Sequence, residues 1–433
     1  MNMQNLKLLV AAVAILASPL AAAAVKIEHW TASTGARVFF VETRALPIVD
    51  VQVDFSAGAA RDPAGKSGLA QLTRGLMDLG AAGMDESAIS EKLADLGARL
   101  GGGADTDRAS VSLRTLADAD KRSAAFSIMR SVIAEPRFPG AIFERERTRT
   151  LAALRESLTR PETLAARAFW SSLYGTHPYG VQPTAESLAA IDVSDLKDFH
   201  AAHYVARSAA VTIVGALSRS EAEALAVFLT EALPSGEAQP PIAVPEMPKA
   251  GEVRVAHHAA QAHIQIGQPA LKRGDPDFYA LQVGNYTLGG GGFVSRLMKE
   301  VRDKRGFAYS VYSYFAPMQE AGPFQIGLQT KRAQAGEALQ VTRDVLRQFL
   351  VEGPSEAELA AAKANIIGSF PLRLDTNRKI LDNVAVIGFF GLPLDYLDAY
   401  AENVRKVTAA DVRAAFARHV SPENLVTVVV AGD

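Results

Sequence analysis

The chain has 433 residues, of which 48% are apolar and 21% charged, so it has enough apolar sequence for a globular core and wholesale disorder is excluded. Lysine and arginine number 45 against 47 aspartates and glutamates, a near-balance that does not favour nucleic acid as a partner. The absence of cysteine excludes disulfides, thiolate metal sites and a thiol nucleophile. Any chemistry therefore rests on histidine, carboxylate, arginine, tyrosine or serine side chains.

The first 24 residues are typical of a secretory signal peptide. Lys7 precedes an apolar run from Leu8 to Leu16, and Pro19 and four alanines follow. The run is short compared with the ~20 residues of a membrane span, which disfavours the alternative of an uncleaved anchor. We therefore expect residues 1–24 to be removed before Val25. We expect the mature protein to be exported to the periplasm, without a transmembrane span.

The mature sequence has an organisation that repeats. A proline-rich stretch, residues 234–248, predicts a linker between an N-terminal lobe (25–233) and a C-terminal lobe (249–433). Each part ends with a helical pattern that leads into a strand pattern, residues 195–215 in the first and 411–431 in the second. Asp195 and Asp411 are separated by the same offset as His203 and His419.

The order of elements also repeats along the two parts. Each part opens with β-rich sequence, continues with a helix of apolar spacing (the first through Leu69 and Leu72, the second through Phe293 and Leu297), and then has further strands and long charged helices. The further strands are expected at 109–116, 309–315 and 323–329. Since strands and helices do not alternate strictly, antiparallel sheets are favoured. The sequence predicts an α+β fold of two homologous lobes, each a largely antiparallel sheet packed with helices.

The segment from Ser67 to Gly80 resembles the zinc helix of the inverted-zincin peptidases, the family of pitrilysin, insulin-degrading enzyme and mitochondrial processing peptidase. Active members carry His-x-x-Glu-His there, in which two histidines bind zinc and the glutamate is the general base. The three positions are Gln71, Arg74 and Gly75 in this chain, and Leu-Ala-Ala at residues 151–153 stands where a further glutamate ligand is expected. The resemblance implies half of a clamshell with a degenerate zinc site.

Histidines elsewhere give no convincing metal site. His200 and His203 share a helical face, but a pair at a helix end without metal is the favoured alternative. His257 and His263 are expected on one strand face about 20 Å apart, at ~3.3 Å per residue, and His258 on the other face. We therefore expect no metal and no cofactor in this chain.

A second segment, residues 288–311, combines a glycine run, an amphipathic helix and a strand. Arg302 is expected in the last helical turn, Gly306 at the helix cap, and Tyr309 at the start of an alternating strand, on the same face as Val311. An arginine can donate to peptide carbonyls, and a phenol can donate to the oxyanion of a tetrahedral intermediate. The alternatives are a cation placed favourably at a helix C-terminus and an ordinary strand aromatic.

The same segment resembles the Arg–Tyr pair in the non-zinc half of the inverted-zincin family. The resemblance implies that Arg302 and Tyr309 bind substrate and stabilise the transition state in trans, with Gly290 and Gly291 also contacting substrate. The glycine runs 289–292 and 101–103 lack the context of a phosphate-binding loop, and residues 177–180 are expected to form a rigid turn.

The resemblance thus implies a non-catalytic subunit of a bacterial heterodimeric zinc peptidase. Its expected partner is a homologous subunit that carries His-x-x-Glu-His and the zinc, and its expected substrates are peptides. One alternative is a catalytically silent peptide-binding or assembly scaffold of the cell envelope. Another is a self-sufficient peptidase with an unrecognised metal site.

Overall fold

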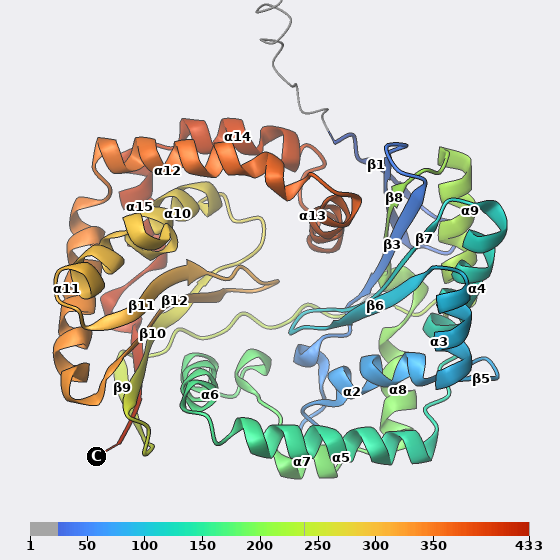
Figure 1. Cartoon of the computed structure of the whole chain (residues 1–433), viewed down its shortest axis with the longest axis horizontal. Coiled ribbons are helices and arrows are strands. Elements are labelled where there is room, and N and C mark those ends of the chain that lie inside the picture. The colour runs from blue at the N-terminus through green and yellow to red at the C-terminus, as the bar shows by residue number, and fades with distance from the viewer. Residues whose placement is uncertain (1–24, 238, 433) are drawn as a thin grey trace, which may run out of the picture.

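The structure is a computed structural model that describes residues 25–237 and 239–432. The predicted signal peptide lies outside the described residues. Figure 1 shows two lobes side by side, each with a sheet and a surrounding layer of helices. The N-terminal sheet has the order β1-β2-β8-β3-β7-β6, and only its β2–β8 pair is parallel within the described chain. Its strands are β1 (Glu28–Thr31), β2 (Arg37–Glu42), β3 (Ile48–Phe55), β6 (Arg99–Ala104), β7 (Ala109–Leu116) and β8 (Ala210–Gly215).

Alternation along β3 determines which side of this sheet forms the core of the lobe. Val49, Val51 and Val53 are fully buried in that core, whereas Asp50 and Asp54 point to the opposite face. Short strands β4 (Gly80–Ala81) and β5 (Met84–Asp85) form a separate hairpin. The helices of this half are α2 (Leu69–Leu76), α3 (Glu86–Asp95), α4 (Ala119–Ala134), α5 (Gly140–Ser157), α6 (Pro161–Tyr174), α7 (Ala185–Ala189), α8 (Val193–His203) and α9 (Arg219–Thr230).

The C-terminal sheet repeats this topology. Its order is β9-β13-β10-β12-β11, and only β9–β13 is parallel among the described strands, so β9, β13, β10, β12 and β11 correspond to β2, β8, β3, β7 and β6. The prediction of two homologous, largely antiparallel lobes is confirmed. The strands are β9 (Gly251–Ala256), β10 (Gln261–Leu271), β11 (Ala308–Phe315), β12 (Gly322–Lys331) and β13 (Val426–Ala431). The helices are α10 (Phe278–Asn285), α11 (Ala335–Glu352), α12 (Glu356–Ser369), α13 (Asn377–Phe390), α14 (Tyr396–Lys406) and α15 (Ala409–His419), with π-helical segments η5 (Tyr286–Gly290) and η7 (Met298–Asp303).

The correspondence of the first helices differs from the prediction. The helix after β10 is α10, and it packs on α15 as α2 packs on α8. The helix through Leu69 is therefore equivalent to α10, and η7 takes the position of α3, just before the edge strand. The sequence did not reveal α10, because its apolar residues do not form a single stripe and it runs directly into the glycine run.

Each lobe covers the sheet of the other lobe with one helix. Helix α6 of the N-terminal half packs on β13 and β10, and α13 of the C-terminal half packs on β8 and β3 (Figure 1). Both contacts are close. A Cβ atom at Gly388 of α13 would lie 2.6 Å from the ring of Phe39, and one at Gly267 of β10 would lie 2.7 Å from the ring of Phe169. The two helices thus bury sheet faces that their own lobes leave open.

A polar contact also joins the lobes, at the turn between β11 and β12. The Tyr179 hydroxyl donates to Asp107 Oδ1 at 2.7 Å and accepts from the backbone N–H of Glu320 at 3.0 Å. Asp107 Oδ2 accepts from the N–H of Gln319 at 2.8 Å. Segment 177–180 is a short 3-10 turn, and its Tyr179 is 2% exposed, so its function in the fold is to fasten this hairpin to the N-terminal lobe.

Candidate functional site

The three degenerate zinc positions lie on α2, and they differ sharply in exposure. Gln71 and Gly75 are exposed, whereas Arg74 is only 3% exposed. The Arg74 guanidinium donates from Nε to the Ser110 carbonyl at 2.6 Å and from Nη2 to the Gly101 carbonyl at 2.5 Å. Arg74 therefore connects α2 to the edge strand β6 and to its neighbour β7.

This arrangement does not fit the zinc ion that the resemblance implies. A buried cation stands where the general base would be, and neither Gln71 nor Gly75 can supply an imidazole. On α5, Leu151 packs against the core of the lobe and Ala152 and Ala153 are exposed, so no carboxylate comes from there. Arg74, at the middle position, instead makes a structural contact with two backbone carbonyls.

The histidines singled out in the sequence have other contacts. His200 Nε2 lies 2.8 Å from the Ile133 carbonyl, and burial lowers the pKa of this ring, so it donates to that carbonyl in the neutral form. Burial, followed by the charge of Arg61, lowers the pKa of His203. The expectation that His257 and His263 share one strand is wrong. Strand β9 ends at Ala256 and β10 begins at Gln261, so the chain turns between the two histidines, and β13 separates the two strands.

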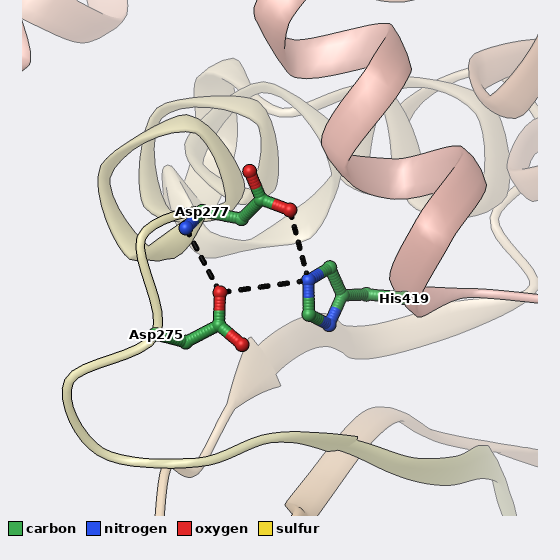
Figure 2. A group of neighbouring side chains, drawn as sticks. All are labelled: Asp275, Asp277 and His419. Carbon is green, nitrogen blue, oxygen red and sulfur yellow. Dashed lines mark hydrogen bonds and ion pairs between the residues drawn. The ribbon is translucent and has the colours of Figure 1, made fainter.

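Among the described residues, one group offers three metal-ligand atoms: Asp275, Asp277 and His419 (Figure 2). His419 Nε2 lies 3.0 Å from Asp277 Oδ2 and 3.6 Å from Asp275 Oδ1, and His419 Nδ1 lies 2.9 Å from the Ala270 carbonyl. Arg418 donates to both oxygens of Asp277 at 2.7 Å and is the main cause of its lowered pKa. Because Arg418 already neutralises Asp277, the group is an ion-pair network that holds the end of α15 to the start of α10.

Arg302 and Tyr309 lie together, and a third residue joins them. Arg302 is in the last turn of η7, which Gly306 ends in the left-handed conformation (φ 63°). The Arg302 Cζ atom lies 4.9 Å from the centroid of the Tyr309 ring and 5.0 Å from that of Phe293. The guanidinium is therefore held between two aromatic rings, a cation–π arrangement. The sequence placed Phe293 only in the apolar stripe of the helix.

The orientation of Tyr309 differs from the predicted alternation. A register shift between Ala308 and Val311 places one extra residue in β11, so Tyr309 does not share the buried face of Val311. The Tyr309 side chain is 82% exposed as a result. A bulge of this kind redirects a side chain, and here it turns the phenol away from the sheet toward Arg302.

The glycine run is not a loop that opens the helix, as expected from the sequence. Gly289 and Gly290 continue α10 as the π-helical segment η5. A Cβ atom at Gly290 would lie 2.6 Å from Asn285 Nδ2, and one at Gly291 would lie 2.6 Å from the Tyr286 carbonyl oxygen. Tight packing of this segment therefore accounts for both glycines. Their predicted contact with substrate stays a prediction.

Exposed large apolar and aromatic side chains lie on β11 and on the preceding 3-10 turn, and we call them the β11 aromatic surface: Phe293, Val294, Tyr309, Tyr312 and Tyr314. Tyr312 and Tyr314 stack with ring centroids 6.0 Å apart, and burial raises the pKa of Tyr314 to about 12. Strand β11 is the edge of its sheet, so one side of its backbone is unpaired by any described strand. An edge strand with exposed rings and a stacked cation suits the recognition of an extended peptide.

Fold and site together define a two-lobed relative of the zinc peptidases whose own zinc-ligand positions hold no ligands. Two family models match the sequence, insulinase (peptidase family M16) over residues 37–183 and the peptidase M16 inactive domain over residues 190–366. The crystal structure of a peptidase M16 inactive domain from Pseudomonas fluorescens is 38% identical, with a TM-score of 0.90 and coverage of 94% of this chain and 98% of that chain. The chain belongs to the peptidase M16 family.

Two further proteins are similar over nearly the whole chain. The non-peptidase homolog YmxG of Helicobacter pylori is 24% identical over 398 residues, 91% of each chain. The periplasmic protease PqqL from Escherichia coli has a TM-score of 0.79 at 16% identity, which shows the fold alone, and the match covers 94% of this chain but 46% of PqqL. None of the helices in the described part of the chain combines the length and apolar character needed to cross a membrane.

Proposed function

We propose that this protein is the non-catalytic subunit of a two-chain zinc peptidase and donates Arg302 and Tyr309 to a homologous partner that binds the metal. The observation that carries the proposal is the stacked, accessible Arg302–Tyr309 pair. In the same chain, the general-base position holds Arg74, which is buried and donates to backbone carbonyls. The pair would face a cleft shared with the partner. The peptide to be cleaved would lie between them.

The state of Arg302 supports a role in binding. Its guanidinium makes no ion pair and donates no hydrogen bond to any residue within 25–237 and 239–432, although its neighbour Arg305 donates twice to Glu300. The Phe293 and Tyr309 rings hold the guanidinium by its faces, so the N–H groups at its edge stay available. A fork of donors fixed in this way can bind two carbonyl oxygens of a peptide backbone.

The position of Tyr309 supports a role in the transition state. The bulge in β11 directs the phenol outward beside the guanidinium, where it can donate to an oxygen that gains negative charge. Loss of one such donor typically lowers kcat about 100-fold to 1,000-fold. A loss of kcat of this size would distinguish an oxyanion donor from a tyrosine that only packs against its neighbours.

The relatives support the proposed assembly and location. The chain matches about half of PqqL, as expected if two chains of this size assemble what PqqL carries in one. PqqL is described as periplasmic, which agrees with export of this protein by its N-terminal segment. The name of the Helicobacter pylori relative, a non-peptidase homolog, agrees with a chain that cleaves no peptide alone.

The test is reconstitution with a homologous M16 chain that carries His-x-x-Glu-His. Tyr309→Phe, which keeps the ring that stacks on Arg302, should lower kcat about 100-fold while the complex still forms. Arg302→Ala should lower kcat/KM to a similar extent. Arg305→Ala is the matched control at the same helix end, because Arg305 pairs with Glu300, and it should retain activity.

The alternative is a scaffold that binds peptides or other proteins without contributing to catalysis, and the exposed β11 aromatic surface favours it. Unchanged turnover in both Tyr309→Phe and Arg302→Ala, with the complex intact, would support the scaffold. Chelator-sensitive peptide hydrolysis by the purified chain alone would refute both readings, because it would require a metal site in this protein.

A further inference from the structure

We propose that the seam between the two lobes contains a binding site for a small multivalent anion, a compound that carries phosphate or several carboxylate groups. The site is a cavity of about 330 Å³ lined by four arginines, three from the N-terminal lobe (Arg37, Arg61, Arg207) and one from the C-terminal lobe (Arg273). No carboxylate belongs to its described lining. The site is separate from the Arg302–Tyr309 pair, and the inference does not depend on the proposed peptidase function.

The four arginines lack the ion pairs that arginines elsewhere in the molecule make. None of them lies within 4.0 Å of a carboxylate oxygen of residues 25–237 or 239–432, whereas Arg114, Arg296 and others form close pairs. Arg37 donates to two carbonyl oxygens at the end of α13, that of Gly388 at 2.6 Å and that of Phe389 at 3.5 Å.

The remaining three arginines make fewer hydrogen bonds, although the Arg273 Cζ atom lies 5.2 Å from the centroid of the Phe390 ring. Arg61 donates to Ser56 Oγ at 3.3 Å, and the side chains of Arg207 and Arg273 donate no hydrogen bond to any described residue. The Nε atoms of Arg61 and Arg273 are buried from solvent and have no partner in the described part of the chain. A buried donor without an acceptor costs free energy, and an anion in the cavity would supply the missing acceptors.

The neighbouring acidic groups do not neutralise this cluster. Asp107 is the carboxylate whose charge stabilises the protonated form of Arg61, but its two oxygens already accept hydrogen bonds from the Tyr179 hydroxyl and the Gln319 N–H. Asp54 and Asp105 both pair with Arg108. Burial lowers the pKa of Arg37, Arg61 and Arg273, and the attraction of Asp54 on Arg37 and of Asp107 on the other two offsets only part of this effect.

The lining favours an anion over other ligands. Guanidinium groups match phosphate and carboxylate geometry through paired N–H donors. The hydroxyls of Ser56 and Ser208 and the amides of Gln239 and Gln319 add neutral polar groups, and Phe389 and Phe390 form an apolar wall. A volume of about 330 Å³ is at the lower end of small-molecule pockets, which excludes a folded partner.

The position of the site has a mechanical consequence. Its lining comes from the N-terminal lobe, the segment between the lobes (Gln239), the turn between β11 and β12 (Gln319) and the end of α13 (Phe389, Phe390). An anion that binds arginines from both lobes would hold the lobes in the arrangement described here. Binding should therefore raise the temperature of unfolding by mass action.

The experiment measures binding of pyrophosphate and of citrate to the purified mature chain by titration calorimetry, together with thermal unfolding. Saturable binding of one or both is expected, and the preferred anion distinguishes a phosphate site from a carboxylate site. Arg61→Gln and Arg273→Gln should each weaken binding about tenfold or more, because each removes one charged fork. Arg44→Gln, at an exposed arginine that pairs with Glu42, is the matched control and should leave binding unchanged.

A second measurement is the unfolding temperature of each variant in the absence of anion, which shows whether a loss of binding is due to misfolding. Arg61→Gln and Arg273→Gln each remove a buried cation that forms no ion pair within the described residues, so both should unfold at the same temperature as the wild type or higher. Arg273→Lys, which keeps the charge but loses the fork, should bind with intermediate affinity. The proposal is overturned if neither anion binds saturably, if sodium chloride of equal ionic strength gives the same stabilisation, or if Arg44→Gln weakens binding as much as the two test variants.

Discussion

Replacing Arg74 tests whether the former catalytic position has become part of the framework. Arg74→Met keeps much of the volume of the side chain but removes both donors, so the carbonyls of Gly101 and Ser110 lose their contacts with α2. A hydrogen bond from a charged group contributes about 1.5–3 kcal/mol. Methionine also avoids the cost of burying a guanidinium, which offsets part of this loss.

The net loss in the free energy of unfolding should be about 2–3 kcal/mol. For a unit of about 200 residues, this corresponds to a fall in Tm of about 5–10 °C. The loss should be localised as well. Because Arg74 holds the edge strand β6, backbone amides in residues 99–104 should exchange with deuterium faster in Arg74→Met, while amides of β10 and β13 should be unaffected.

Urea unfolding and hydrogen exchange measured by mass spectrometry would give both quantities. Gln71→Met, on the exposed side of the same helix, is the matched control and should stay within about 0.5 kcal/mol of the wild type. Arg74→Lys should fall between the two, because an ammonium group cannot span both carbonyls in the same way. Equal stability of Arg74→Met and the wild type, with unchanged exchange in β6, would refute the argument that Arg74 is structural.

Two further predictions concern buried polar groups between the lobes. Burial holds the pKa of Asp54 at about 6, above its ordinary value of 3.8, so the folded state retains a proton that the unfolded chain releases and stability falls as pH rises between these values. Asp54→Asn should therefore raise the free energy of unfolding by about 1–3 kcal/mol at pH 8 and by little at pH 4. Urea titrations at the two pH values measure this difference. An equal gain at both pH values would contradict the raised pKa of Asp54. Tyr179→Phe removes the hydroxyl that contacts Asp107 and Glu320, so stability should fall by about 1–2 kcal/mol and proteolysis in residues 234–248 should accelerate. Tyr286→Phe is the control, because the Tyr286 hydroxyl makes no hydrogen bond to any described residue, and its stability and proteolysis should stay at the wild-type level.

The parts of the fold that were predictable from the sequence are those encoded by local patterns. The apolar alternation of residues 109–116 predicts β7 to the residue, and that of 309–315 and 323–329 predicts β11 and β12 to within two residues at either end. The repeated order of elements predicts the two lobes. The absence of zinc ligands at Gln71, Arg74 and Gly75 could also be predicted from the sequence, because the ability to bind zinc depends directly on residue type.

The parts that were not predictable depend on contacts between distant segments. The bulge that exposes Tyr309 arises from the register between β11 and β12, and alternation alone predicted the wrong face. Arg74 looks like a misplaced cation in the sequence, and only the packing of α2 on β6 supplies the carbonyls that bind it. Arg61 and Arg273 are more than 200 positions apart and meet only because the lobes pack together.

The exchange of α6 and α13 bears on how such a protein could arise. Each is the third helix after the hairpin at the edge of its lobe's sheet, and each covers the sheet of the other lobe. The arrangement therefore has the form of a domain-swapped symmetric dimer. One ancestral copy alone would have left an apolar sheet face in water, but two copies could have covered each other. Gene fusion then needed only a tether, which raises the effective concentration of each half for the other without any new contact. The duplicated chain thus corresponds to a homodimer whose two subunits are covalently linked. Once linked, the two halves could diverge in sequence without losing their partner.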